Sequence, residues 1–290
     1  MLHFKKHKAY PYMTNYYFLL IQFFVALVAL FLLWKTVQHF RRKARYKRIA
    51  GMAFPSTYQD ILTPLRQYQA LSPTQKEKIH FLILLFVEQK EFIAAKMNID
   101  DKVKVIVAFY ACLMRLGFEV GEKDHVQTII VYPKHFIVHD NTNNGIHNNK
   151  SVVLEGQSSN GTVVISWQDI EANIAKEDKD NVIIHEFAHE LDFEDGLADG
   201  TPLLENSNYK RWSKVFSKAF DTLSTLKEEH ESSEALKHLG YYALTNEAEF
   251  FAVCSERFFE TPKTFKRHFP DVYEELKGFY RLDAEVLFAR

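Results

Sequence analysis

Two histidines four residues apart, with a glutamate directly after the first, stand in the stretch NVIIHEFAHELDFEDG. Either Asp180 or Asn181 can cap a helix through this stretch. Residues four apart share one face of a helix, so His185 and His189 can hold one ion between their imidazoles. Glu186 lies one step around the helix, at the edge of the same site. The pattern therefore predicts a helix that presents two metal ligands and one carboxylate.

This arrangement is suited to hydrolysis by zinc. Two neutral imidazoles are good zinc ligands, and the ion lowers the pKa of a bound water to about 7. A neighbouring carboxylate can take the proton of that water and pass it to a leaving amine, which makes Glu186 the candidate general base. The alternative is a helix whose histidines are partly exposed and solvated. The helical setting favours one zinc ion per chain, bound by His185 and His189.

A catalytic zinc site needs a third protein ligand and an open position. Asp195 stands where the extended metzincin pattern has histidine, but that pattern also requires glycine where this chain has Asp192. Glu249, in NEAEFFAVCSERFFETP, is the better candidate. It lies in the first turn of a helix that Asn246 can cap, so its carboxylate could instead return to the Asn246 backbone as a capping box. Periodicity alone leaves both roles of Glu249 open.

The residues after the first fifty, 51–290, are predicted to form one soluble domain. LSPTQKEKIHFLILLFVEQKEF predicts a helix in which Ser72 is the N-cap, Pro73 takes the first position and Gln75 completes a capping box. Its apolar run is too short to cross a membrane, which favours a buried helix. DDKVKVIVAFYACLMRLGF predicts another helix, which ends near Gly117.

Two strands are predicted from β-branched and aromatic residues, at 125–139 and 161–167. The second is a candidate for the edge of a sheet, and an Asn-rich loop at 140–150 separates the two. From Gln168 onward most of the chain favours helix, with a polar break at 196–207. The predicted fold class is α+β, dominated by helices with a small β-sheet.

A membrane anchor is predicted near the N-terminus. Residues 16–34 read YYFLLIQFFVALVALFLLW, in which Gln22 is the single strongly polar residue. A helix of about 20 apolar residues crosses a bilayer, and aromatic residues stand at both ends of this run, as they do in membrane proteins. A buried core helix would show a polar face, and a cleaved signal peptide would end in small residues. We therefore expect one transmembrane helix at 15–34.

The flanking charges predict its orientation. The tail at 1–14 carries three lysines, whereas the basic juxtamembrane segment at 35–50 carries seven lysines and arginines. Positive residues stay on the cytoplasmic side. We expect a single-pass protein of the cell membrane, with residues 15–34 in the lipid bilayer and the domain at 51–290 facing the cytoplasm. The basic segment is also suited to anionic headgroups. An uncleaved export signal with the domain outside the cell is the alternative.

The overall composition is that of a globular protein. The chain has 290 residues, 47% of them apolar, and a net charge of −1, which gives no indication of a nucleic-acid partner. Two cysteines, Cys112 and Cys254, are too few for a disulfide framework and fit a reducing compartment.

Five stretches resemble the Mlc titration factor A family of zinc-dependent peptidases. They are VYPKHF, ISWQDI, NVIIHEFAHELDFEDG, NEAEFFAVCSERFFETP and FPDVYEELKGFY, in the family's order over residues 54–283. TNEAEFF also resembles the catalytic domain of lethal-factor-like toxins. The resemblance implies a zincin-like metallopeptidase domain, with His185, His189 and Glu249 as zinc ligands and Glu186 as the general base.

The resemblance also implies that Tyr242 stabilises the oxyanion of the tetrahedral intermediate, a role that suits a phenol donor. The alternative for Tyr242 is a packed aromatic beside Tyr241. Where the toxin has a carboxylate one turn after the third ligand, this chain has Val253, so support for the ligands must come from elsewhere, with Glu256 as a candidate. Asp192 shares a face with the two histidines and either orients an imidazole or is solvated.

Two functions follow from these observations. The first is a membrane-anchored zinc peptidase that holds peptide or protein substrates beside the strand at 161–167. An aminopeptidase is one form that the resemblance allows, and Glu190, Glu194 or Glu247 could then bind the free amine. The second is a protein that sequesters a transcription regulator and has little or no catalytic activity. Glu186 argues against the second, because a structural zinc site does not need it. The soluble family member best known by name lacks the anchor, which puts its regulatory role in doubt for this chain.

Overall fold

The structure is a computed structural model. It describes residues 11–94, 97–121, 125–134, 161–176, 179–205 and 207–288. The chain divides into two compact units, Met1–Ala53 and Phe54–Arg290. The predicted loop at 140–150 and residues 135–139 of the strand predicted at 125–139 lie outside the described residues.

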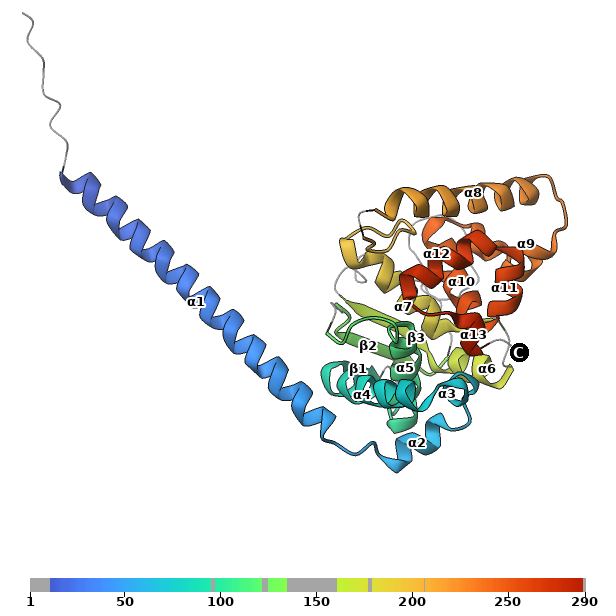
Figure 1. The fold of residues 1–290 in the computed structure, drawn as a ribbon, viewed down its shortest axis with the longest axis horizontal. Helices are drawn as coiled ribbons and strands as arrows, with labels where there is room; N and C mark the ends of the chain where they lie inside the picture. Colours follow the sequence, from blue (N-terminus) through green and yellow to red (C-terminus); the bar gives the residue numbers. More distant parts are fainter. Residues whose placement is uncertain are drawn as a thin grey trace, which may run out of the picture. The chain divides into compact units, whose positions relative to one another are not determined.

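Helices dominate the described residues, and a small sheet accompanies them, as the sequence predicted (Figure 1). The first unit contains helix α1 (Pro11–Ala50). The second contains the strands β1 (Glu91–Ala94), β2 (Thr128–Tyr132) and β3 (Thr162–Ser166); the helices α2 (Ser56–Leu62), α3 (Arg66–Ala70), α4 (Pro73–Gln89), α5 (Asp101–Met114), α6 (Trp167–Lys176), α7 (Val182–Asp192), α8 (Tyr209–Glu228), α9 (Glu234–Leu239), α10 (Glu247–Glu260), α11 (Pro262–His268), α12 (Pro270–Tyr280) and α13 (Ala284–Phe288); and the 3-10 helices η2 (Phe193–Asp195) and η3 (Tyr241–Leu244).

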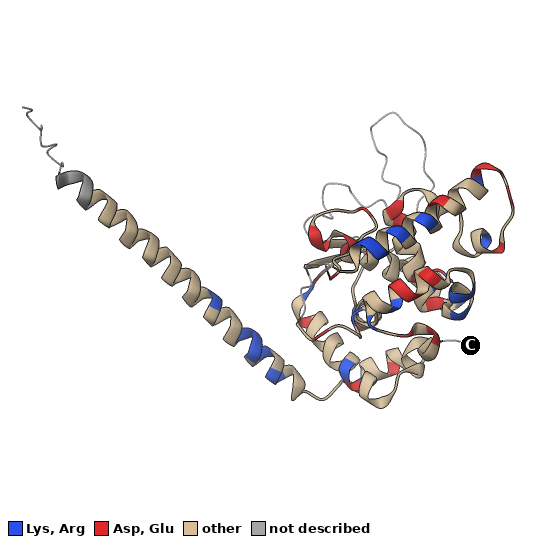
Figure 2. Cartoon of the chain, turned by 45° about the horizontal axis from the view of Figure 1, so that its top comes forward, with Lys and Arg blue, Asp and Glu red and all other residues tan. Residues whose placement is uncertain are grey.

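Helix α1 is longer than the predicted membrane span. It runs without interruption through the apolar residues 16–34 and on through the basic segment at 35–50, where Lys and Arg gather (Figure 2). Between Pro11 and Gly51 the sequence has neither glycine nor proline, and its lysine, arginine, glutamine and alanine residues favour helix. By length and composition α1 can cross a membrane. Its apolar part, 19 residues at about 1.5 Å each, matches the thickness of the hydrocarbon core.

The sheet has three parallel strands in the order β1–β2–β3. Within the described residues β3 pairs on one side only, so the predicted edge position is confirmed. Strand β1 differs from the prediction, which continued the α4 helix to Phe92. The helix ends at Gln89, and Phe92 instead pairs with Ile129 of β2. Helix propensity in a short segment gives way here to pairing with a buried neighbouring strand.

The predicted helix starts are confirmed where the structure tests them. The Ser72 hydroxyl accepts a hydrogen bond from Gln75 N at 3.3 Å, and the Gln75 side chain accepts one from Ser72 N at 2.9 Å. Helix α5 is buried over almost its whole length and packs against α4 and α7. Helix α7 in turn packs against β3, α5 and α10, which places it inside the second unit.

Gly117 allows the end of α5 to approach the end of α12. A Cβ at this position would lie 2.1 Å from Tyr280 O and 2.6 Å from Arg281 O, which are both backbone atoms. No side chain larger than hydrogen fits without moving one of these segments.

We expect Gly117→Ala to lower the free energy of unfolding by about 1–3 kcal/mol, because the added methyl group overpacks a backbone contact. Gly278→Ala is the matched control. It lies within α12, a methyl group added there would have nothing within 4 Å, and alanine should stabilise the helix by about 0.5–1 kcal/mol. Urea unfolding followed by circular dichroism measures both. A Gly117→Ala protein as stable as Gly278→Ala would contradict the close approach.

Candidate metal centre

Helix α7 begins where the sequence predicted. Of the two candidate caps, Asn181 is the one used, because its Oδ1 accepts a hydrogen bond from Ile184 N at 3.2 Å. The helix ends at Asp192, and the chain turns at Gly196, whose φ of 94° is in the left-handed region that favours glycine. His185 is 7% exposed and Glu186 4% exposed, so this helix carries its polar residues into the interior rather than on a solvated face.

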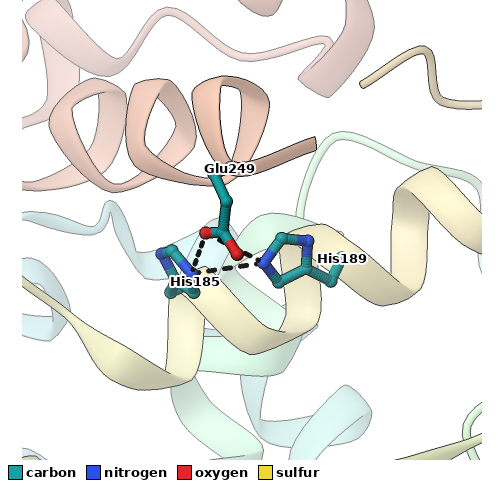
Figure 3. A group of neighbouring side chains, drawn as sticks. All are labelled: His185, His189 and Glu249. Atoms are coloured by element: carbon teal, nitrogen blue, oxygen red, sulfur yellow. Dashed lines mark hydrogen bonds and ion pairs between the residues drawn. The ribbon is translucent and has the colours of Figure 1, made fainter. Parts of the chain in front are cut away.

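Three candidate ligand atoms meet where α7 faces α10 (Figure 3). His185 Nε2 lies 3.2 Å from His189 Nε2, and Glu249 Oε2 lies 3.0 Å from the first and 3.5 Å from the second. The Glu249 carboxylate forms no capping box with the Asn246 backbone in the residues that the structure describes. Asn246 Oδ1 caps α10 by accepting from Glu249 N at 2.9 Å, while the Glu249 carboxylate turns toward the imidazoles.

The separations of these atoms fit a tetrahedral zinc ion. Ligand atoms bound at about 2.0–2.1 Å in a tetrahedron lie about 3.4 Å from one another. The three observed separations, 3.0, 3.2 and 3.5 Å, are close to the edges of such a tetrahedron. Two imidazoles and one carboxylate also match a common donor set for catalytic zinc, with a fourth position left open.

Glu256 supports the first of these ligands. Its Oε1 accepts a hydrogen bond from His185 Nδ1 at 2.8 Å, so that in the neutral imidazole the lone pair is on Nε2, which faces the site. Its Oε2 accepts from Asn181 N at 2.7 Å, so the same carboxylate holds the start of α7. Val253 is 3% exposed and supplies no polar group, so Glu256 is the residue of α10 that supports His185.

The charges at the site attract one another. Burial opposes protonation of the His185 imidazole, but the carboxylates of Glu249 and Glu256 outweigh this effect and raise the pKa of His185 to about 10. Burial likewise opposes ionisation of Glu249, yet the hydrogen bonds from His185 and His189 hold its pKa well below its usual range. A metal cation competes with protons for these ligands, because imidazole must be neutral to bind it.

Tyr242 lies beside the ligands, on η3. Its ring centroid is 5.9 Å from that of His185. Partial burial and the carboxylates of Glu249 and Glu186 raise the pKa of Tyr242 above its usual range, so the phenol keeps its proton and can donate it in a hydrogen bond. Tyr241 is 63% exposed, and the aromatic ring that Tyr242 faces is His185.

Asp192 and Asp195 do not belong to the group of candidate metal ligands. Asp192 is fully buried, and its Oδ2 accepts from Gly200 N at 2.8 Å, so the solvated one of its two alternatives is wrong. Burial raises the pKa of Asp192 to about 7. No hydrogen bond joins it to either imidazole in the part of the chain that the structure describes. Asp195 is exposed and accepts from Leu197 N, which leaves Glu249 as the third ligand candidate.

The carboxylates considered for a free amine have mixed surroundings. Glu190 is buried, and its Oε2 lies 2.9 Å from His125 Nε2. Glu194 Oε1 lies 3.0 Å from Arg115 Nη1. Glu247 is exposed on the first turn of α10. None of the three belongs to the group of candidate ligands.

A third carboxylate of α10 that contacts α7 or its cap, Glu260, was not predicted from the sequence. Glu260, 8% exposed, accepts hydrogen bonds from Asn181 Nδ2 at 2.7 Å, Gln67 Nε2 at 2.6 Å and Arg66 Nη2 at 2.8 Å. Its spacing from Glu249 and Glu256, at helical positions 0, 7 and 11, was the available signal, because those positions share one face of a helix.

We expect Glu249→Ala to lower the zinc content of the purified protein strongly, since two imidazoles remain without the carboxylate that completes the set. Glu247→Ala, which removes an exposed carboxylate two positions earlier on the same helix, is the control and should keep one zinc per chain. Elemental analysis by mass spectrometry measures both. An unchanged zinc content in Glu249→Ala would leave Glu249 as a residue of the helix start only.

Comparison with known proteins identifies relatives of this chain. The model of the family "Glucose-regulated metallo-peptidase M90" matches residues 38–281, a range that begins after the apolar segment. An uncharacterized protein of Synechocystis is 32% identical over 247 residues, which is 82% of this chain and 88% of the relative. Mlc titration factor A of Klebsiella pneumoniae is 31% identical over 218 residues, or 73% of this chain and 81% of the relative. Mlc titration factor A of Pectobacterium atrosepticum is 32% identical over the same shares. The chain therefore belongs to the glucose-regulated metallo-peptidase M90 family.

Proposed function

We propose that the chain is a zinc-dependent peptidase with a zincin-like catalytic unit, held at the membrane by α1. The observation that carries this proposal is the convergence of His185 Nε2, His189 Nε2 and Glu249 Oε2 at tetrahedral separations. Family membership supports a metallopeptidase. The buried Glu186 in the same helix supports catalysis over a structural metal, because a structural site has no use for a non-ligating carboxylate beside its ligands.

The residues of the site divide the work of peptide hydrolysis. Zinc, when bound, lowers the pKa of a coordinated water and polarises the scissile carbonyl. Glu186 takes a proton from the attacking water and passes it to the leaving nitrogen. The Tyr242 phenol donates a hydrogen bond to the carbonyl oxygen as negative charge develops there. Glu256 keeps the His185 imidazole in the tautomer whose Nε2 can bind metal.

The substrate backbone is proposed to lie along β3. Strand β3 pairs with β2 on one side within the described residues and packs against α7, the helix that carries the histidines. An extended peptide added at this edge would form main-chain hydrogen bonds with β3 and pass close to the ligands.

Glu186→Gln is the decisive test. We expect this protein to keep its zinc and to lose about 10²–10⁴-fold in kcat, because the amide cannot accept the proton. The wild type and variant, both with verified zinc content, are incubated with an unbiased peptide mixture, and the products are read by mass spectrometry. Asp195→Asn, which changes an exposed carboxylate just after the same helix, is the control that should cleave normally. Equal cleavage by wild type and Glu186→Gln would exclude Glu186 as the base.

A second function is favoured by the name that several relatives share. Mlc titration factor A names a protein that titrates a regulator, and the chain is about 31% identical to it. Binding of a transcription regulator without peptide hydrolysis would be the function if zinc-loaded wild type cleaves nothing in the mixture. If Glu186→Gln still binds the transcription regulator, then that binding does not depend on peptide hydrolysis, and one chain can have both functions.

The orientation in the membrane is the remaining part of the proposal. The seven lysines and arginines at 35–50, against three lysines at 1–14, favour a cytoplasmic position for the second unit. We expect a fluorescent reporter fused after residue 290 to be active and an alkaline phosphatase fused there to be inactive. Phosphatase activity outside the cytoplasm would reverse the topology.

A further inference from the structure

Gly200 contacts both of the helices that carry the candidate metal ligands. It is buried, and its N–H donates to Asp192 Oδ2 at 2.8 Å, at the end of α7. A Cβ at this position would lie 2.4 Å from Glu247 O and 2.7 Å from Glu247 C, which are backbone atoms at the start of α10. One residue therefore joins the end of α7 to the start of α10, by a hydrogen bond on one side and a close backbone contact on the other.

The backbone conformation and a buried tryptophan hold Gly200 in place. Its φ of 78° is in the left-handed region that favours glycine. Trp212 is 1% exposed, and its Nε1 donates to Gly200 O at 3.1 Å. The indole stacks on Phe216 of α8, with 4.1 Å between ring centroids, and meets Phe251 of α10 edge-on at 5.8 Å. Since both backbone polar groups of Gly200 have partners inside the fold, moving this residue would leave buried groups without their hydrogen bonds.

The contact lies close to two of the three candidate ligands. Asp192 follows His189 by three residues, and Glu247 precedes Glu249 by two. The separation of His189 Nε2 and Glu249 Oε2, 3.5 Å, spans the two helices. Because residues two or three apart on one helix have fixed relative positions, a change in the spacing at Gly200 changes that separation.

The opposite end of the contact between α7 and α10 is held by side chains. There Glu256 and Glu260 of α10 accept hydrogen bonds from Asn181, the cap of α7. Glu256 also accepts from His185 Nδ1, so the first ligand is supported from that end. Gly200 supplies a contact to each helix at the end where the other two ligands lie.

We propose that Gly200 and Asp192 are positioning residues for the metal centre, and that they set the separation of His189 and Glu249. The proposal rests on the metal site of the proposed function and does not require peptide cleavage. A side chain at Gly200 would push the start of α10 away from α7 and move the Glu249 carboxylate away from the imidazoles. Loss of the Asp192 acceptor would release Gly200 from α7. In both cases zinc would lose the third ligand and bind more weakly.

Gly200→Ala tests this role, with Gly196→Ala as the matched control. Gly196 has a φ of 94°, so alanine meets the same kind of backbone strain there, but an added Cβ has nothing within 4 Å. Zinc affinity is measured on the full chain in detergent by competition with a fluorescent chelator. We expect Gly200→Ala to bind zinc about 10–100-fold more weakly than wild type, and Gly196→Ala to bind it as wild type does. Equal zinc affinities of the two folded variants would overturn the proposal.

Two substitutions of Asp192 test the hydrogen bond to Gly200 N. Asp192→Asn keeps a side-chain oxygen that can accept it, whereas Asp192→Ala removes the acceptor. We expect the zinc affinity of Asp192→Asn to stay close to that of wild type and that of Asp192→Ala to fall about ten-fold. This pair also carries the test if Gly200→Ala does not fold. An equal loss in the two variants, or no loss in either, would overturn the role assigned to Asp192.

Cobalt(II) in place of zinc separates positioning from a loss of stability. The visible spectrum of the cobalt protein depends on the number and geometry of the ligands, and not on the free energy of unfolding of a folded protein. Gly200→Ala should change this spectrum, and Gly196→Ala should leave it unchanged although it also lowers stability. A wild-type spectrum in Gly200→Ala would leave Gly200 with a role in stability only and would overturn the proposal.

The results also distinguish this proposal from the peptidase. Weaker zinc binding by Gly200→Ala, together with a wild type that cleaves no peptide, would support the positioning role and contradict the peptidase. Cleavage of the peptide mixture by the wild type, together with equal zinc affinities of Gly200→Ala and Gly196→Ala, would support the peptidase and overturn the positioning role. A folded wild type that binds no zinc would overturn both.

Discussion

The packing of one face of α10 against α7 is the interaction on which the site depends. Glu249, Glu256 and Glu260 stand at positions 0, 7 and 11 along α10. The carboxylate of each contacts a residue of α7 or the Asn181 cap. Burying three carboxylates is costly unless each is hydrogen-bonded. Here the donors are imidazoles, a backbone N–H and side-chain amides, so the cost is offset by charge-assisted hydrogen bonds. A shift of either helix would break several of these bonds together, and the two helices are thereby held in one register.

This packing extends to the amino-terminal part of the second unit. Arg66 and Gln67 of α3 donate to Glu260, and Arg66 also donates to the carbonyl of Phe288. The side-chain amide of Asn181 also donates to Glu260, and its Oδ1 caps α7. Residues almost two hundred positions apart along the chain therefore meet behind the histidines. The order of the site depends on complete folding of the unit, and not on α7 alone.

The sequence predicted those parts of the structure that depend on local chemistry. The Ser72 capping box, the cap before α7 and the shared face of His185 and His189 follow from spacing along one segment. The direction of the Glu249 carboxylate could not be predicted in this way, because periodicity places a residue on a face of its own helix but does not show which element that face contacts. Glu260 was missed for the same reason. Strand β1 was missed because four residues carry little propensity, and its partner β2 lies more than thirty residues further along the chain. The burial of Asp192 depends on the return of the chain at Gly200, which no local pattern predicts.

The uninterrupted course of α1 has a consequence for where the second unit can act. If residues 16–34 span the bilayer, the remaining 16 residues of the helix extend about 24 Å from its hydrophobic boundary. Such a stalk is stiffer than a coil of equal length, so the point of attachment of the second unit stays close to the membrane surface. Encounters would then occur mainly within a thin layer beside the bilayer, where tethering raises the effective concentration of any partner that is itself bound to the membrane.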